Sequence, residues 1–234
     1  MSKAVLFSIK PKYCELIANG KKTVEVRKTR PKLETPFKVY IYCTKGEYLW
    51  KDKERVFLDG KYNRIIDNMP ECLLNGKVIG EFVCNSIEEF QAEFTDLKYF
   101  DSQNENVCQN TIKRVAWLED EYEPYYFYET SNEEDNPNDC TLLRHSCLTF
   151  DELRQYIGET FFDKSFYGLH ISNLVIYDQP RELSNFRKPC IYGEESDVSC
   201  FLCDKSGYRP DMHIDCFNEV TRPPQSWYYV EELI

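Results

Sequence analysis

The fold of this chain is decided by residues 20–27, whose sequence is Gly20-Lys21-Lys22-Thr23-Val24-Glu25-Val26-Arg27. Polar and apolar residues alternate from Thr23 onward, which predicts a strand with one polar face because successive strand side chains point to opposite faces. We expect Thr23, Glu25 and Arg27 to share that face, with Lys22 at its entrance. Such a set can bind an anion, recognise a base edge or move a proton. The alternative is an exposed Glu-Arg ladder on an edge strand, which contributes little energy.

The segments around this junction predict an α+β fold. Residues 4–9 predict a buried strand, and residues 11–19 predict a short helix that ends at Gly20. The other predicted elements are strands at 37–43, 77–84, 166–177 and 226–230, and a helix that starts at the capping box Thr149-Phe150-Asp151-Glu152. Within the strand at 77–84, Gly80 indicates a bulge or a close approach of another backbone. This order of elements favours a mixed β-barrel with short flanking helices over a parallel α/β sheet.

The length of 234 residues predicts one domain, 1–234, that carries insertions. The predicted additions to the core fold are insertions at 44–75 and 100–147 and a cysteine-containing excursion at 187–222. Residues 119–139 are acidic and rich in tyrosine, and their clustered Asn, Asp and Pro predict an inserted or mobile loop.

Charge is distributed unevenly along the chain. The formal net charge is −11, but residues 1–60 hold fourteen Lys and Arg against seven Asp and Glu, a balance of +7, so the other 174 residues carry −18. One interpretation is a basic face that meets a nucleic acid or a nucleotide. The other is an ordinary solvated surface.

The N-terminus has no apolar signal region, and no stretch approaches the 18 or more apolar residues of a membrane span. The sequence therefore predicts a cytoplasmic protein that does not bind to membranes. The eleven cysteines are expected to be mostly reduced thiols, buried as small hydrophobic residues.

A metal site is predicted in the C-terminal excursion. Cys200 and Cys203 have the Cys-x-x-Cys spacing with which two thiolates hold one zinc ion, and Cys190 or His213 together with Cys216 can complete four ligands. Such a structural zinc would order the excursion and is the only cofactor that the sequence predicts. An ordinary reduced loop is an equal alternative, and a redox dithiol is a poorer one.

Residues 6–28 resemble the ASCH family. The family signature is Gly-x-Lys-x-x-Glu-x-Arg between the first helix and the next strand, and its positions are held here by Gly20, Lys22, Glu25 and Arg27. Weaker similarity to the same family is found at residues 76–82, at residues 148–153 and at Trp227. The resemblance implies a PUA-like barrel with a cleft beside the signature, a fold associated with the recognition of RNA and modified nucleosides.

Some members of the ASCH family are hydrolases that remove acyl groups from modified cytidine, and others are ribonucleases. The deacylating members have a threonine at the position of Glu25 and a glutamate shortly before the second helix. Here that later region reads Arg144-His145-Ser146-Cys147 and contains no carboxylate. In an enzyme, Lys22 would donate a proton and Glu25 would be the base.

The leading functional prediction is a module that binds RNA or a modified nucleoside through Lys22, Thr23, Glu25 and Arg27. Among the aromatic residues, Tyr42 and Trp227 are predicted to stack on a base, although most aromatic residues of a barrel fill its core. A nucleoside amidohydrolase or a metal-independent ribonuclease is the second prediction. An acidic protein that binds another protein or mimics a nucleic acid is the third. The oligomeric state is left open.

Overall fold

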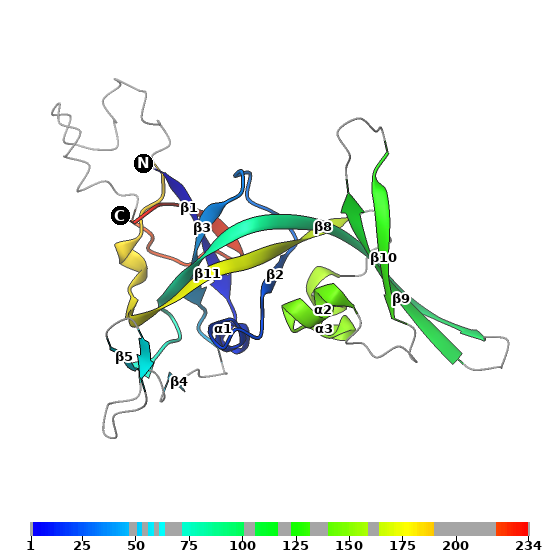
Figure 1. The fold of residues 1–234 in the computed structure, drawn as a ribbon, viewed down its shortest axis with the longest axis horizontal. Coiled ribbons are helices and arrows are strands. Elements are labelled where there is room, and N and C mark those ends of the chain that lie inside the picture. The colour runs from blue at the N-terminus through cyan, green and yellow to red at the C-terminus, as the bar shows by residue number, and fades with distance from the viewer. Residues whose placement is uncertain are drawn as a thin grey trace. The chain divides into compact units, whose positions relative to one another are not determined.

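The structure of the protein is a computed structural model that describes residues 2–46, 51–52, 56–58, 61–63, 72–100, 106–116, 123–131, 140–158, 164–189 and 219–233. The helices are α1 (Pro11–Ala18), α2 (Thr141–Ser146), α3 (Phe150–Ile157) and the 3-10 helix η2 (Leu183–Asn185). The strands are β1 (Lys3–Ile9), β2 (Val24–Arg27), β3 (Phe37–Cys43), β4 (Lys51–Asp52), β5 (Val56–Leu58), β6 (Lys61–Asn63), β7 (Cys72–Leu73), β8 (Val78–Phe100), β9 (Asn106–Ala116), β10 (Tyr125–Ser131), β11 (Ser165–Arg181) and β12 (Trp227–Glu231) (Figure 1). A mixed β-sheet with few short helices is therefore confirmed. Its closure into a PUA-like barrel stays a prediction.

The chain divides into two compact units, each built from separated segments. The first unit is Met1–Glu15, Phe37–Val83 and Asn173–Ile234, and the second is Leu16–Pro36 and Cys84–Ser172. The long strands β8 and β11 each contribute residues to both units. The expected single domain and its insertions stay a prediction.

The first unit is built on β1, whose residues Ala4 to Ile9 are all buried. β1 pairs parallel with β3 and antiparallel with β12, with Val5 opposite Val39 and Tyr229. β3 is in turn a neighbour of β8. Parallel neighbours need a crossover connection, and residues 10–36, which contain α1 and β2, supply it between β1 and β3. The predicted strands at 4–9, 37–43 and 226–230 and the predicted helix at 11–19 are thus confirmed.

Gly80 lies where two strands of the first unit come close together. A Cβ atom at this position would press on the carbonyl oxygen of Val175 and lie 3.1 Å from the Cα of Ile176, both backbone atoms of β11. A strand backbone cannot move aside as a side chain can, so the position requires glycine. The close approach that the sequence indicated at Gly80 is confirmed.

Gly80→Ala is expected to lower the free energy of unfolding by about 1–3 kcal/mol, the usual cost of overpacking. Gly46→Ala is the matched control, because a Cβ atom at Gly46 meets nothing within 4 Å. Urea unfolding of both variants measures the difference. Equal stability of the two variants would contradict the close packing of β8 against β11.

The second unit joins two sets of strands around one core. β8, β9 and β10 pair antiparallel in that order, and β11 pairs antiparallel with β2, with Leu169 opposite Glu25. The apolar face of β2 and residues of α2 and α3 belong to one cluster, whose members are Val24, Val26, Phe90, Ala92, Phe94, Ile112, Cys140, Leu142, Leu143, Leu153 and Phe166. Figure 1 shows α2 and α3 side by side. The predicted capping box of α3 is present, with Thr149 and Glu152 each accepting a hydrogen bond from the other residue's amide.

The loop prediction for residues 119–139 was wrong at 125–131, which form β10 and pair with β9. The aromatic run from Tyr125 to Tyr128 has high β-propensity, and the acidic residues around it masked that signal. β8 is also much longer than the predicted strand at 77–84, and α2 was not predicted. Of the expected insertions, 100–147 contains β9, β10 and α2, and 44–75 contains β4 to β7.

The described cysteines agree with the expectation of buried thiols. Cys14, Cys43, Cys84 and Cys140 are buried and form no disulfide, and Cys147 is a partly exposed thiol. Among the described helices, none is long and apolar enough to cross a membrane.

Candidate functional site

The polar face of β2 is held in place from both of its ends. α1 ends at Ala18, and the turn that follows it contains Gly20, whose φ of +70° is a conformation that glycine adopts without strain. The amides of Lys21 and Lys22 then donate to the carbonyl of Leu16, which turns the chain toward β2. Beyond this turn, β11 pairs with the strand, with Tyr167 opposite Arg27. The candidate site therefore begins in the turn directly after the first helix.

Three charged side chains converge at this position, and we call them the Lys22 cluster: Lys22, Glu25 and Arg27. The Glu25 carboxylate lies 3.3 Å from Nζ of Lys22 and 2.9 Å from a terminal nitrogen of Arg27. Lys22 also donates a hydrogen bond of 2.7 Å to the carbonyl oxygen of Ser146, at the end of α2. The three residues are only 2%, 7% and 4% exposed, respectively. An exposed Glu-Arg ladder, the alternative reading, does not describe them.

Burial changes the pKa of the lysine in the Lys22 cluster. Desolvation lowers the pKa of Lys22 below its ordinary value, although the nearby Glu25 carboxylate acts in the opposite direction. A lysine with a lowered pKa exchanges its proton closer to neutral pH than a surface lysine does, and such groups are concentrated at functional sites. The cluster can therefore offer hydrogen-bond donors and an acceptor, and it can also transfer a proton.

Tyr156 belongs to the same site, and the sequence did not single it out. Its hydroxyl is in hydrogen-bonding contact with the side chain of Arg27 and the backbone of Lys28. Burial raises the pKa of Tyr156, but its side chain is still 37% exposed. In the sequence Tyr156 has the spacing of an apolar helix stripe with Leu153 and Ile157, so nothing distinguished it from a core residue.

Thr23 has a structural position next to the cluster. Its amide donates to the carbonyl of His145 in α2, and its own carbonyl accepts from the amide of Ile171 in β11. The residue is exposed and lies just before β2, whose buried polar face is formed by Glu25 and Arg27. Thr23 thus connects the entrance of the site to α2 and β11 through its backbone.

The two predicted stacking residues lie in the first unit. Tyr42 is only 3% exposed and belongs to the hydrophobic cluster of that unit. Trp227, at the start of β12, packs edge-on against Tyr229 with ring centroids 5.4 Å apart. The structure brings Lys22, Glu25 and Arg27 together, and the contributions of Tyr42 and Trp227 to binding stay predictions.

The predicted zinc ligands Cys190, Cys200, Cys203 and Cys216, and His213, lie outside the described residues. Zinc binding in the C-terminal excursion is therefore still a prediction. Within the described ranges, no group of three or more His, Cys, Asp or Glu side chains is placed to hold a metal ion.

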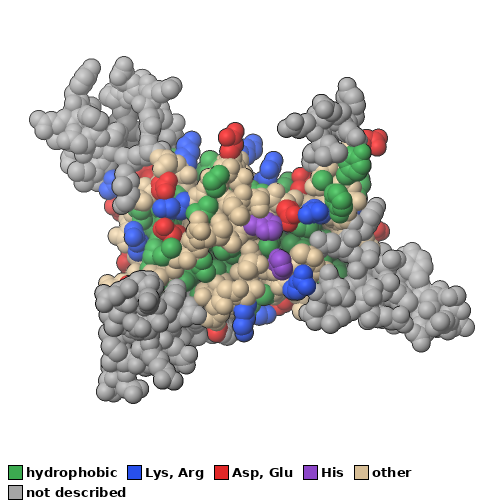
Figure 2. All heavy atoms as spheres, viewed as in Figure 1, with side chains coloured by type: hydrophobic (Ala, Val, Ile, Leu, Met, Phe, Trp, Pro, Cys, Tyr) green, Lys and Arg blue, Asp and Glu red, His purple; other side chains and the backbone are tan. Residues whose placement is uncertain are grey.

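His170 takes part in a second charged group of the second unit. Its Nε2 lies 2.7 Å from one oxygen of Glu88, and Arg114 donates to the other oxygen at 2.7 Å. Figure 2 shows the described histidine side chains beside acidic and basic ones on one face. Burial alone would raise the pKa of Glu88, but the hydrogen bonds from His170 and Arg114 outweigh it and lower the pKa below its ordinary 4.5.

The lowered pKa of Glu88 predicts a specific loss of stability in acid. The unfolded chain takes up the proton first, so the contribution of ionised Glu88 is complete above pH 4.5 and is lost as the pH falls through the folded-state value. The stability advantage of the wild type over Glu88→Gln should therefore shrink as the pH falls below about 4.5. Denaturant unfolding of both proteins at several pH values measures this stability difference. A difference that does not change with pH would contradict the prediction.

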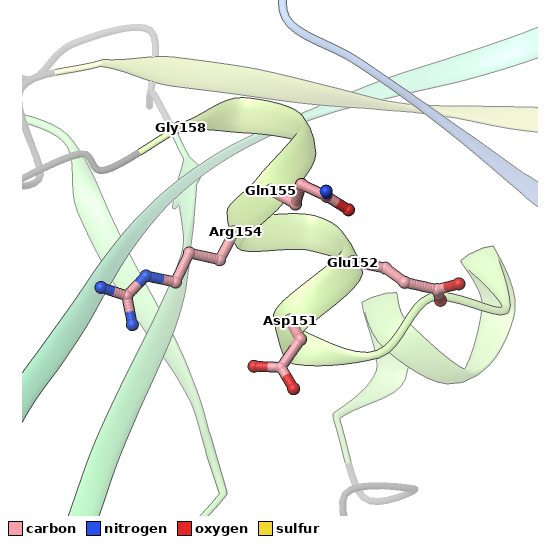
Figure 3. A pocket seen from close by; sticks show the side chains of 5 residues that line it. All are labelled: Asp151, Glu152, Arg154, Gln155 and Gly158. Atoms are coloured by element: carbon pink, nitrogen blue, oxygen red, sulfur yellow. The ribbon is translucent and has the colours of Figure 1, made fainter.

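A shallow hollow beside α3 is lined by Asp151, Glu152, Arg154, Gln155 and Gly158. In Figure 3 the labelled side chains point in different directions from the helix instead of toward a common centre. Glu152 is also engaged in the capping box with Thr149. The hollow is thus a feature of the helix surface, and the Lys22 cluster remains the candidate site.

Residues 7–126, which include the whole junction and the Lys22 cluster, match the family model described as the ASCH domain. The chain belongs to the ASCH domain family. All four signature positions of this ASCH protein lie in the matched segment, while Ser146 and Tyr156, which contact the cluster, lie beyond it.

Two solved structures are similar to this ASCH protein. The crystal structure of ASCH from Zymomonas mobilis has 14% sequence identity and a TM-score of 0.40, over 77% of this chain and 73% of that chain. The crystal structure of a point mutant of the same Zymomonas mobilis protein has 15% identity and a TM-score of 0.39, over 78% and 77% of the two chains. Among curated proteins, no match to the chain was found.

Proposed function

We propose that this ASCH protein binds RNA or a modified nucleoside at the Lys22 cluster. The observation that carries the proposal is the convergence of an ammonium and a guanidinium on one carboxylate, at 3.3 Å and 2.9 Å, in a nearly buried position. Charged groups are rarely this deeply buried for stability alone, because desolvation offsets most of their mutual attraction. A binding role explains why the chain maintains them.

The cluster has the polar groups that a nucleobase requires. The Glu25 carboxylate can accept a hydrogen bond from an amino or imino group of a base, and Lys22 and Arg27 can donate to a carbonyl oxygen or a phosphate. The three side chains together carry a formal charge of +1, which favours an electron-rich or anionic ligand. Because the ion pairs fix these side chains before binding, less conformational entropy is lost when the ligand enters.

Catalysis at the same residues is the second candidate, and the lowered pKa of Lys22 favours it. Lys22 would donate a proton and the Glu25 carboxylate, 3.3 Å away, would act as a base toward an acylated nucleoside or RNA. The binding proposal requires no such transfer.

Binding and turnover assays separate the two candidates. The wild-type protein is titrated with a single-stranded RNA and with an acylated cytidine, and both mixtures are analysed by chromatography for products. Binding without product supports the module, whereas product formation that is lost in Lys22→Ala supports the enzyme. Failure of both probes to bind at about 1 mM would contradict the proposed function.

A further inference from the structure

The segment that follows β2 places exposed cations over aromatic rings. Nζ of Lys28 lies 5.6 Å from the ring centroid of Tyr156, and Cζ of Arg30 lies 5.7 Å from that of Tyr167. Lys28 and Arg30 are both exposed. Residues 21–36 hold six Lys and Arg against two Glu, in a chain whose net charge is −11. We call Lys28, Arg30, Tyr156 and Tyr167 the basic-aromatic strip.

The strip is joined to the Lys22 cluster through Arg27. The Tyr156 hydroxyl contacts the Arg27 side chain and the Lys28 backbone, so one tyrosine touches both the cluster and the strip. Tyr167 is the cross-strand partner of Arg27, and paired residues of antiparallel strands project from the same face. Both aromatic rings of the strip are therefore neighbours of a buried cluster residue.

We propose that the basic-aromatic strip binds the backbone and bases of a single RNA strand that continues out of the Lys22 cluster. The inference rests on the proposed function and narrows it, because the ligand becomes a polynucleotide strand instead of a free nucleoside. Lys28 and Arg30 contact two phosphates, and the tyrosine rings stack on the neighbouring bases.

The composition of the strip favours RNA over other polyanions. Cations beside aromatic rings match a single strand, which has both phosphates that the cations can contact and flat unpaired bases that can stack. An acidic peptide would use the cations but has no bases for the rings. An anionic membrane would need apolar side chains that insert between lipids, and the strip contains none.

The test compares two ligand sizes in the wild type and in the double variant Lys28→Gln/Arg30→Gln. The wild type should bind a single-stranded RNA of about eight nucleotides more tightly than an acylated cytidine. In the double variant the slope of log affinity for RNA against log salt concentration should become shallower by about 1.4, the value for two phosphate contacts on a single strand. Its affinity for the nucleoside should be unchanged.

Two further variants of the chain complete the experiment, one as a control for charge and one as a test of stacking. Lys3→Gln/Arg222→Gln removes the same kinds of charge from exposed positions of the first unit and should retain the wild-type salt slope. Tyr167→Leu should weaken RNA binding roughly fivefold to 150-fold, as expected for one lost stacking contact, while the salt slope stays the same. Thermal melting confirms that each variant is folded.

The outcomes separate this inference from the proposed function. If the double variant binds RNA with the wild-type affinity and slope while the nucleoside still binds, the strip is not an RNA track and only this inference fails. If neither RNA nor nucleoside binds the wild type, both proposals fail. If an octaglutamate peptide binds as tightly as the RNA, the partner is an acidic protein segment and the inference is overturned.

Discussion

Glu25→Gln is expected to lower the free energy of unfolding by about 3–5 kcal/mol, the cost of removing one partner from a buried ion pair. The Glu25 carboxylate lies between two buried cations, at 3.3 Å from Lys22 and 2.9 Å from Arg27. Its removal changes the formal charge of the cluster from +1 to +2 and leaves two like charges close together. Because the carboxylate also keeps the pKa of Lys22 from falling further, the lysine should lose its proton more readily in the variant.

Urea unfolding of Glu25→Gln and Glu93→Gln measures this effect. Glu93 is a partly exposed residue of β8 in the same unit, so its substitution removes one carboxylate without affecting the buried cluster. We expect Glu93→Gln to change the stability by less than about 0.5 kcal/mol, as is usual for surface positions. Similar stabilities of the two variants would mean that the charges of the cluster are not desolvated.

Lys22→Met is expected to weaken ligand binding about 100-fold or more, while it costs less stability than Glu25→Gln. Methionine fills nearly the same space as the aliphatic part of lysine, and the remaining Glu25–Arg27 pair has no net charge. The loss consists mainly of the hydrogen bond to the Ser146 carbonyl, about 1–3 kcal/mol, and is partly offset because the buried ammonium no longer has to be desolvated.

The effect on binding should be much larger than the effect on folding. A charge-assisted hydrogen bond in a shielded site is strong, and the loss of such a donor weakens binding about 100-fold or more. Equilibrium binding of the RNA and nucleoside probes measures this loss, and Lys164→Met, an exposed lysine of the same unit, is the control. If the Lys22→Met variant binds both probes with wild-type affinity, Lys22 is not part of the binding site.

The pH dependence of folding gives a separate check on the environment of Lys22. The unfolded chain holds the Lys22 proton up to pH 10.5, while the folded chain releases it at a lower pH. The wild type should therefore gain stability relative to Lys22→Met as the pH rises from the folded-state pKa toward 10.5. If an ion pair raised the pKa of Lys22, instead of burial lowering it, the wild type would lose stability relative to Lys22→Met as the pH rises.

Much of the fold could be predicted from local sequence patterns. The alternation in 23–27, the run 37–43 and the capping box at Thr149 each depend on neighbouring residues, and the structure has β2, β3 and α3 at these places. β10 was not predicted because acidic residues around its aromatic run masked the strand signal. α2 was not predicted because its formation depends on a distant partner: it buries Leu142 and Leu143 in a core shared with β2.

The sequence by itself determined which charged side chains lie on one face of β2, because alternation along a strand is a local property. Only the tertiary structure decided that these side chains are buried, since their surroundings come from residues far along the chain. The carbonyl that Lys22 contacts belongs to Ser146, 124 positions away, and Tyr156 reaches Arg27 from α3. Desolvation, which lowers the pKa of Lys22, arises from this long-range packing and has no signal in the eight residues of the junction.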